Sequence, residues 1–373
     1  MKIGINARFL PQLYTGIGKY SYNLLSALAQ LDETNEYFLF TPQLVDFPLP
    51  DNFKQIRVPE KDYHSPSLRK AHWEYSLIPQ EIKKWGIHLA HFLYPSNPLI
   101  KLGIPTVVTV HDMIPWRLPE YNKRLRSRLY HMHAKWALKR ADHVITVSDF
   151  SKEEIQKIIG IENKNLSVTH LAPPVTHYDD MPPGLDLRRK FLLYVGGYDS
   201  RKNIPMLMIA YQKFIANYHP IDLILVGAKG RGLEDYITDE FTQKVANRFP
   251  VRPKGRIIFT EPLQDSELCA LYKQTTALVH PSIYEGFNLP LVEAMKHDKP
   301  LVVADIPVNR EVAGAAGFFV DPKNEDTFGI GLHEFLNDSQ LQNKLAAGAA
   351  ERKKDFNWKQ TAQQTLDVYN LFM

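Results

Sequence analysis

The sequence predicts an α/β protein built from two domains, each with a parallel β-sheet of its own. The chain has 373 residues, and because single hydrophobic cores stop growing at roughly 250–300 residues, two cores are expected. Short β-branched runs alternate with longer segments of helical periodicity, which is typical of βα units and a parallel sheet. This alternation breaks off near residue 170 and starts again near residue 190.

The expected strands are runs of β-branched and aromatic residues. In the first half they are 3–9, 37–41, 106–110 and 143–147, and in the second half 191–195, 221–226, 256–260, 277–280 and 301–304. Prolines and adjacent acids interrupt regular structure between the halves. We therefore predict an N-terminal domain at 1–172, a linker at 173–189 and a C-terminal domain at 190–355. The apolar positions of 356–373 predict a helix that packs back on the N-terminal domain.

Composition and charge narrow the class of protein. Lys and Arg number 45 against 41 Asp and Glu, and the resulting charge of +4 suits anionic ligands without indicating nucleic acid. A single cysteine, Cys269, excludes an intrachain disulfide and a multi-cysteine zinc site. The single cysteine, together with an N-terminus that lacks the apolar core of a signal peptide, favours the cytoplasm. No run reaches the ~20 apolar residues of a membrane span.

Two acids, Glu285 and Glu293, flank the expected start of a helix that follows a buried strand. Asn288 is expected as the N-cap and Pro290 in the first turn, which leaves Glu285 in the preceding loop. Free amides at a helix N-terminus bind phosphate, whereas carboxylates accept hydrogen bonds from sugar hydroxyls. The pair indicates a pocket for a sugar diphosphate. The alternative is that the acids only complement the helix dipole.

A second segment follows the strand at 191–195. Gly196 and Gly197 allow a ligand to approach the backbone, and Arg201 and Lys202 place two cations at the carboxyl end of the strand, where open α/β sheets bind ligands. The cations would neutralise a leaving diphosphate in place of a divalent metal, for which the chain has no Asp-x-Asp motif. The alternative is a solvated Arg–Lys pair beside a helix cap.

The first half contributes two weaker signals. Gly16 and Gly18 open a helical stretch and form half of a dinucleotide fingerprint, because Ser21 stands at the third glycine position. Their amides would face a phosphate. His111 follows the strand at 106–110 and would orient a sugar hydroxyl, although a structural hydrogen-bonded pair with Asp112 explains it equally well.

Residues 121–140 are expected to form a basic amphipathic helix. We expect its apolar stripe to belong to the core and its basic face to be solvated, with contact to a membrane surface as the alternative. The stripe is Leu125, Leu129, Met132 and Trp136, and the basic residues are Lys123, Arg124, Arg126, Arg128 and Lys135.

Taken together, these segments resemble the retaining glycosyltransferases of family 4. The resemblance is carried by T-G-I-G at 15–18, T-V-H-D at 109–112, A-D-H-V-I-T-V-S at 141–148, R-K-N at 201–203 and the Glu285 and Glu293 pair. It implies the GT-B fold, with two Rossmann-like domains whose parallel sheets face a central cleft. It also implies a hexosyltransferase without metal or cofactor, which moves a hexose from a nucleotide-diphosphate sugar to a hydroxyl of a glycan, a polysaccharide precursor or a lipid-linked acceptor.

The resemblance also implies roles for individual residues. The donor would lie mainly on the C-terminal domain and the acceptor on the N-terminal one. Glu285 would contact the donor sugar, Glu293 the ribose, Arg201 and Lys202 the diphosphate, and His111 the region of the transferred sugar. The other implied donor-binding residues are Gly16, Gly18, Gly197, Glu261, Leu263, Gly286, Phe287, Asn288 and Leu289.

Two positions depart from the family pattern. Gly197 stands where many members have an arginine, so that Lys202 is the safer assignment for the diphosphate. Asn288 stands where the family often has glycine, and asparagine tolerates the unusual backbone angles expected there.

Several alternatives stay open. The first choice of donor is GDP-mannose, followed by UDP-glucose or another hexose donor. A non-catalytic sugar-nucleotide sensor, a sugar-nucleotide epimerase and, supported only by Gly16 and Gly18, an NAD-dependent oxidoreductase are also considered. Residues 61–75 and 91–97 carry aromatic and polar side chains suited to a glycan or lipid-linked acceptor. Peripheral contact with the inner face of the plasma membrane and the oligomeric state are left open.

Overall fold

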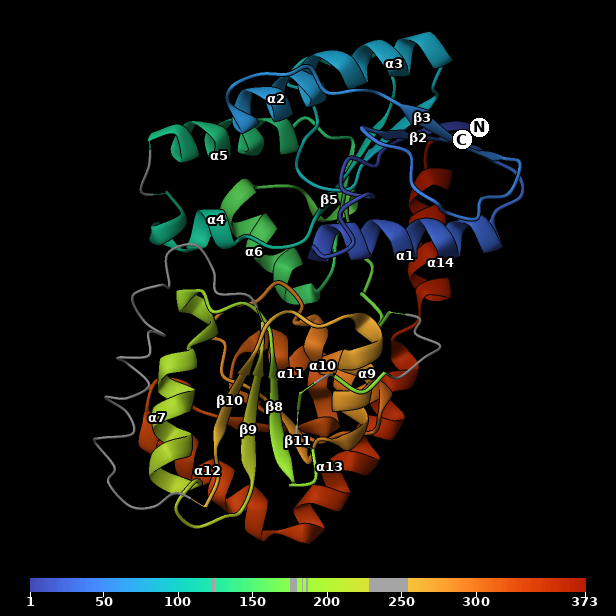
Figure 1. Ribbon diagram of the computed structural model, residues 1–373. Helices are drawn as coiled ribbons and strands as arrows, with labels where there is room; N and C mark the ends of the chain where they lie inside the picture. Colours follow the sequence, from blue (N-terminus) through green and yellow to red (C-terminus); the bar gives the residue numbers. More distant parts are fainter. Residues whose placement is uncertain (123–124, 175–179, 183, 186, 228–253) are drawn as a thin grey trace. The chain divides into compact units, whose positions relative to one another are not determined.

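The chain divides into two compact units, each with its own sheet (Figure 1). The computed structural model describes residues 1–122, 125–174, 180–182, 184–185, 187–227 and 254–373. The first unit is Met1–Leu171 with Asn357–Met373, and the second is Ala172–Phe356. The predicted linker at 173–189 therefore belongs to the second unit, and its residues 175–179, 183 and 186 lie outside the described residues.

The described residues of the first unit form a seven-stranded parallel sheet in the order β3-β2-β1-β4-β5-β6-β7. Sequence patterns missed β3, β4 and β7. The edge strand β3 has three polar residues among its five, β4 contains no β-branched residue, and β7 is only three residues long. The strands are β1 Lys2–Asn6, β2 Glu36–Thr41, β3 Phe53–Arg57, β4 Leu89–Phe92, β5 Thr106–Val110, β6 His143–Thr146 and β7 Leu166–Val168.

Helices cover both faces of this sheet, because successive strand residues point to opposite sides. The helices α1 (Gly16–Leu31) and α14 (Trp358–Asn370) share one core with Ile3 and Ile5, whereas α3 (Ile78–Trp85) and α6 (Asp149–Ile159) share another with Phe38 and Phe40. The remaining helices are α2 Pro66–His72, the π-helix η1 Trp73–Leu77, α4 Ile114–Arg117, α5 Leu125–Leu138 and the 3₁₀ turns Pro119–Asn122 and Asn163–Asn165.

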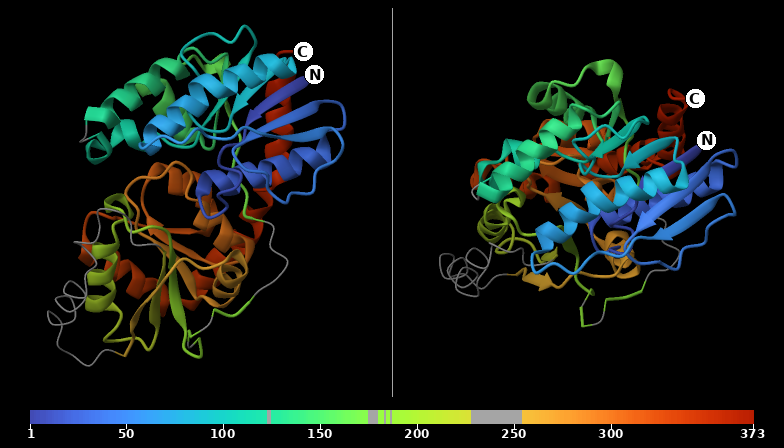
Figure 2. Two further views of the ribbon diagram at one scale, coloured as in Figure 1. Left: turned by 45° about the horizontal axis from the view of Figure 1, so that its top comes forward. Right: turned by 90° about the horizontal axis from the view of Figure 1, so that it is seen from above.

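The last helix belongs to the first unit although it comes at the end of the sequence. In Figures 1 and 2, α14 (red) lies next to α1 and the N-terminal residues (blue). Leu366 and Tyr369 are buried in the same core as Leu24 and Leu28 of α1. Of the apolar positions that predicted a returning helix, Leu366, Val368 and Tyr369 are buried, whereas Leu371 is 64% exposed.

The described residues of the second unit form a six-stranded parallel sheet in the order β10-β9-β8-β11-β12-β13. The reversal of strand order between β8 and β11 is the switch point at which open α/β sheets bind ligands. Only the short edge strand β13 was not expected from the sequence. The strands are β8 Phe191–Val195, β9 Asp222–Val226, β10 Ile257–Thr260, β11 Ala277–His280, β12 Leu301–Ala304 and β13 Gly317–Val320.

One face of this second sheet is covered by α7 (Ile204–Phe214) and α12 (Glu325–Asn337), which share a core with Leu192 and Val302. Figure 1 shows α7 and α12 beside strands β8 to β10. The other helices are α9 Asp265–Gln274, α10 Leu289–Lys296, α11 Pro307–Ala313, α13 Ser339–Arg352 and the 3₁₀ turns η4 Ser200–Lys202, Gly314–Ala316 and Lys353–Asp355.

The prediction for the stripe on α5 is wrong. Leu129, Met132 and Trp136 are 52%, 55% and 62% exposed, and the buried residues of this helix include Ala134 and Ala137 instead. Periodicity identifies an apolar stripe but not what covers it. Residues 123–124 and the side chains of 125–126 lie outside the described part. Among the described residues, no helix combines the length and hydropathy required to cross a bilayer.

Candidate active site

Two neighbouring strands of the second unit end in loops that carry charged residues. Strand β8 leads through Gly196 and Gly197 into η4, and strand β11 ends at His280 before the loop to α10. Because β8 and β11 pair in parallel, their carboxyl ends lie at one edge of the sheet. The amide of Ile283 donates to the carbonyl of Arg201 at 2.8 Å and so joins the two loops.

The carboxylate of Glu285 binds both predicted cations. Arg201 Nη1 donates to Oε2 at 2.5 Å, and Lys202 Nζ donates to Oε1 at 2.6 Å. Arg201 also donates to the carbonyl of Tyr284 at 3.1 Å, and its Nε lies 3.0 Å from Asp199 Oδ1. Glu285 and Lys202 are only 6% and 8% exposed, so water screens these charges weakly. The structure therefore brings three predicted site residues into one cluster.

Glu285 is ionised in this cluster. Burial by itself would raise the pKa of its carboxyl, but the charges of Lys202 and Arg201 lower the pKa to about 2. His280 is fully buried at the end of β11, and burial together with the Lys202 charge lowers its pKa to about 3. At neutral pH Glu285 is therefore a hydrogen-bond acceptor and not a proton donor, and His280 is uncharged.

The glycine after β8 is required by its surroundings. Gly196 has a φ of 153°, and an added Cβ would lie 2.8 Å from the hydroxyl of Tyr194 and 3.6 Å from Lys202 Nζ. The same Tyr194 hydroxyl donates to the carbonyl of Gly197 at 2.6 Å. The buried tyrosine thus fixes the turn from which Arg201 and Lys202 project.

Asn288 precedes α10 in the left-handed conformation, with a φ of 74°, as its tolerance for unusual angles led us to expect. The expected cap is absent, because no hydrogen bond joins its side chain to the start of α10. Its Nδ2 instead donates to Asn309 Oδ1 at 2.8 Å and lies 3.1 Å from His280 Nδ1. The side chain of Asn288 therefore does not cap α10. Pro290 has no amide hydrogen, and the amide of Leu291 donates to the carbonyl of Asn288 at 3.0 Å, so the first-turn amide that suits an anion is that of Leu289.

One buried polar atom in the same loop supports a polar ligand. Ser282 is fully buried, and its Oγ has no hydrogen-bond partner among the described residues. Buried hydroxyls are normally satisfied, so this atom is consistent with a partner that binds from outside the chain.

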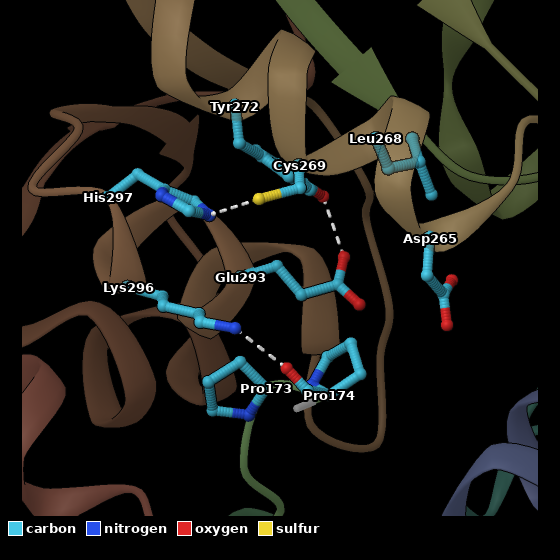
Figure 3. Close-up of a pocket in the computed structure, with 9 residues that line it drawn as sticks. All are labelled: Pro173, Pro174, Asp265, Leu268, Cys269, Tyr272, Glu293, Lys296 and His297. Atoms are coloured by element: carbon cyan, nitrogen blue, oxygen red, sulfur yellow. Dashed lines mark hydrogen bonds between the residues drawn. The ribbon is translucent and has the colours of Figure 1, made fainter. Parts of the chain in front are cut away.

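Glu293 lies within α10 and not in its first turn. Its Oε2 accepts a hydrogen bond from the hydroxyl of Tyr272 at 2.7 Å (Figure 3). Figure 3 shows the pocket around Glu293, formed by residues 173–174 and by side chains of α9 and α10, with Lys296 Nζ donating to the carbonyl of Pro174 at 2.8 Å. Glu293 thus contacts Tyr272, whereas Glu285 contacts Arg201 and Lys202.

In the first unit, Gly16 and Gly18 differ in their surroundings. Thr15 is the N-cap of α1, and its Oγ1 accepts the amide of Gly18 at 3.0 Å. A Cβ on Gly18 would lie 2.0 Å from the carbonyl oxygen of Gln12, whereas a Cβ on Gly16 would meet nothing within 4 Å. Packing thus explains Gly18, whose amide already has a partner, and only Gly16 has space for a ligand.

His111 is held by the backbone. Its Nε2 lies 2.9 Å from the carbonyl oxygen of Leu93, and its ring makes an edge contact with Tyr20 at 4.6 Å. Within the described residues Asp112 is not its partner; Asp112 Oδ1 accepts the amide of Ile114 at 3.0 Å. Burial lowers the pKa of His111 to about 4, so the ring is neutral at physiological pH.

The remaining predicted residues lie on the loops of the second unit. Glu261 and Leu263 follow β10, and Gly286 lies between Glu285 and Phe287. Phe287 is 3% exposed and packs edge-on against Phe356 at 5.8 Å, which gives it a structural role of its own. Leu289 is the first residue of α10.

Sequence reasoning missed Tyr272, Asp199 and Ser282 as neighbours of the predicted residues. Asp199 and Ser282 are short polar side chains in the loops after β8 and β11. Their places in these loops are the only sequence signal that could have identified them. Tyr272 lies on α9, which the sequence gave no reason to place beside Glu293.

Family models match both halves of the chain. Residues 14–172 match Glycosyltransferase Family 4, and residues 179–352 match Glycosyl transferases group 1. Two relatives are O-antigen chain mannosyltransferase B of Escherichia coli, 28% identical over all of both chains, and O-antigen chain mannosyltransferase RfbU of Salmonella typhimurium, 26% identical over 87% of this chain and 88% of the relative.

A solved structure of similar fold is the sucrose-phosphate synthase of Thermosynechococcus elongatus. It has a TM-score of 0.77 and 19% identity and covers 100% of this chain and 98% of its own. At this identity the likeness concerns the fold, which is GT-B as expected from the sequence. The chain is therefore a glycosyltransferase, and it belongs to family 4, with a group 1 glycosyl transferase domain as its second half.

Proposed function

We propose that the chain transfers mannose from GDP-mannose to a hydroxyl of a saccharide acceptor with retention of the α configuration. The observation that carries the reaction type is the cluster of Arg201, Lys202 and Glu285 at the switch point of the second sheet. The choice of mannose rests on the two relatives, which are named as O-antigen mannosyltransferases.

The charge stabilisation is assigned to Arg201 and Lys202. As the bond between mannose and diphosphate breaks, negative charge grows on the leaving diphosphate, and fixed cations in a weakly screened site stabilise that charge. The amide of Leu289 at the start of α10 would add a hydrogen-bond donor to the diphosphate. This donor set requires no metal, so we propose metal-independent transfer without a cofactor.

Glu285 positions both cations and accepts hydrogen bonds from the donor sugar. Its ionised carboxylate already receives one hydrogen bond from each cation, and each oxygen has a further lone pair for a sugar hydroxyl. Glu293 is assigned to the ribose. The loop that contains Glu261 and Leu263 is assigned to the base. His111 and Gly16 are assigned to the transferred sugar and the diphosphate.

The test is a thermal-shift screen of GDP, UDP and NAD, followed by mass-spectrometric detection of hexose transfer from GDP-mannose to a synthetic mannobioside in EDTA. We expect stabilisation by GDP and an acceptor heavier by one hexose. Stabilisation by UDP alone with transfer from UDP-glucose would reassign the donor. Tight donor binding without turnover would indicate a sugar-nucleotide sensor. Conversion of the sugar nucleotide in the absence of acceptor would indicate an epimerase, and stabilisation by NAD alone would indicate an oxidoreductase.

We also propose that α5 contacts an anionic membrane surface, which would bring the chain to a lipid-linked acceptor at the inner face of the plasma membrane. Leu129, Met132 and Trp136 are spaced as one helical face and are all exposed. The exposed cations Arg128, Lys139 and Arg140 flank this face along the chain. An exposed apolar face bordered by cations is typical of helices that lie at a lipid interface.

A further inference from the structure

The predicted acceptor region of the first unit contains a π-helical turn. The turn η1 (Trp73–Leu77) interrupts the helical run between α2 and α3. Trp73 is fully buried, and its Nε1 donates to the carbonyl of Val58 at 2.8 Å, which anchors the turn. Such turns are frequent at functional sites. This turn carries Glu74, which no step of the donor chemistry uses.

Glu74 is buried with an incomplete set of partners. It is 0% exposed, and its Oε1 accepts a short hydrogen bond from the hydroxyl of Tyr94, which follows β4. Its Oε2 has no hydrogen-bond partner among the described residues. A buried carboxylate oxygen without a donor is costly, so its presence needs an explanation other than packing.

Lys70 connects Glu74 to the surface. Its Nζ lies 3.8 Å from Glu74 Oε1 and donates to the hydroxyl of Tyr130 at 2.8 Å. The same ammonium lies 5.1 Å from the ring centre of Tyr94 and 4.8 Å from that of Tyr130. Lys70 is 27% exposed, so a ligand that reaches this surface meets an ammonium group held between two aromatic rings.

Arg8, which follows β1, adds a second donor beside the same cluster. Its Nη2 lies 2.7 Å from Glu60 Oε1, with both side chains half-buried. Each cation of the cluster thus faces a carboxylate, Arg8 with Glu60 and Lys70 with Glu74. Paired donors and acceptors next to aromatic rings match the hydroxyls and the ring face of a neutral sugar, whereas a phosphate site would require unbalanced positive charge.

We propose that Arg8, Glu60, Lys70 and Tyr130 bind the hydroxyls of an uncharged saccharide acceptor, and that Glu74 is the positioning residue that holds Lys70 and Tyr94. The assignment rests on the proposed function, because only a sugar-transferring enzyme needs such a subsite. The proposal names the residues that bind the acceptor and the chemistry of the acceptor. Neither follows from the cluster of Arg201, Lys202 and Glu285.

The ionisation of Glu74 supports this role. Burial raises the pKa of its carboxyl to about 7, against the opposing effects of Lys70, Tyr94 and Arg8, while the charge of Glu60 raises it further. Tyr75, next to it on η1, has its own pKa raised by burial and by Glu74. Glu74 therefore loses its proton near pH 7 and attracts Lys70 more strongly above this pH.

Binding is tested first without donor. Saturation-transfer NMR with methyl α-mannobioside is applied to the full-length wild type, to Lys70→Ala and to the control Lys84→Ala, which removes an exposed lysine of α3 paired with Glu81. We expect the wild type and the control to transfer saturation to the saccharide, and we expect this transfer to be lost in Lys70→Ala. The proposal is overturned if the wild type gives no saturation transfer to the saccharide, or if Lys70→Ala gives as much saturation transfer as the wild type.

Kinetics then separate this inference from the proposed function. With GDP-mannose as donor, Lys70→Ala should raise the acceptor KM about ten- to hundredfold, as expected for a lost charged hydrogen bond, and leave donor hydrolysis in the absence of acceptor unchanged. In the wild type the acceptor KM should fall between pH 6 and pH 8, and this change should be absent in Glu74→Gln.

Two results in these kinetics count against the subsite. An unchanged acceptor KM in a folded Lys70→Ala or Glu74→Gln variant contradicts it, as does inorganic phosphate that competes with the saccharide. If the wild type neither binds nor hydrolyses GDP-mannose, the proposed function fails, while the donor-free NMR result still decides whether the saccharide binds here.

Discussion

The ammonium group of Lys202 donates to Glu285 Oε1 at 2.6 Å, and both residues are almost fully buried. Their positions lie far apart in the sequence, and the pairing of β8 with β11 brings them together. A carboxylate that could recognise a sugar hydroxyl therefore also fixes the cation that would face the diphosphate.

Removing this cation tests the donor site. Lys202→Ala should lower kcat about 100- to 1000-fold, because the developing charge on the diphosphate loses a fixed partner. Measured rates of hexose transfer from GDP-mannose check this, with circular dichroism to confirm folding. Lys213→Ala is the matched control, since Lys213 pairs with Asp326 on the helical face of the same unit. Equal rates in the wild type and Lys202→Ala would refute the assignment.

The ionisation of Glu285 predicts a pH dependence of stability. Its pKa falls from 4.5 to about 2 in the folded state, so the stabilisation is fully present above pH 4.5 and is lost as pH falls toward 2. The shift corresponds to about 3 kcal/mol. Comparing the melting temperature of the wild type with that of Glu285→Gln from pH 7 to pH 2.5 should show the difference shrinking only below pH 4.5. A constant difference over the whole range argues against a depressed pKa.

The two glycines of the α1 start should respond differently to alanine. Gly18→Ala should lower the melting temperature, because its Cβ would overlap the carbonyl oxygen of Gln12. Gly16→Ala should leave the melting temperature unchanged, since its Cβ enters open space, and should weaken GDP-mannose binding if a phosphate approaches there. Calorimetric titration measures the second effect. Unchanged affinity in Gly16→Ala removes Gly16 from the donor site.

The exposed face of α5 predicts membrane association. The wild type should float with vesicles of 30% phosphatidylglycerol in phosphatidylcholine, and the substitutions Met132→Ser and Trp136→Ser together should reduce the floated fraction about tenfold or more, because they remove the apolar contact. High salt should weaken the remaining attraction. Exposed Tyr218 and Ile330 of the second unit provide a matched apolar control pair. Equal flotation of the wild type and the α5 variant would exclude this face.

The sequence by itself determined the two parallel sheets, the return of the last helix and the charged residues that cluster at the edge of the second sheet. Strand runs with βα spacing specify a parallel sheet, and the carboxyl end of each strand marks where ligand-binding side chains lie. For this reason Arg201, Lys202 and Glu285 were predictable. Strands β3 and β7 were not predictable, because three of the five residues of β3 are polar and the three residues of β7 carry too little periodicity.

Only the tertiary structure decided which side chains meet. Local patterns do not encode that Tyr272 contacts Glu293, that Gly18 lies against Gln12, or that the stripe on α5 is uncovered. They also gave no reason to join Glu74 to Tyr94, which follows β4. Such contacts depend on how strands order in the sheet and on which face each helix buries, and neither is a property of one segment of sequence.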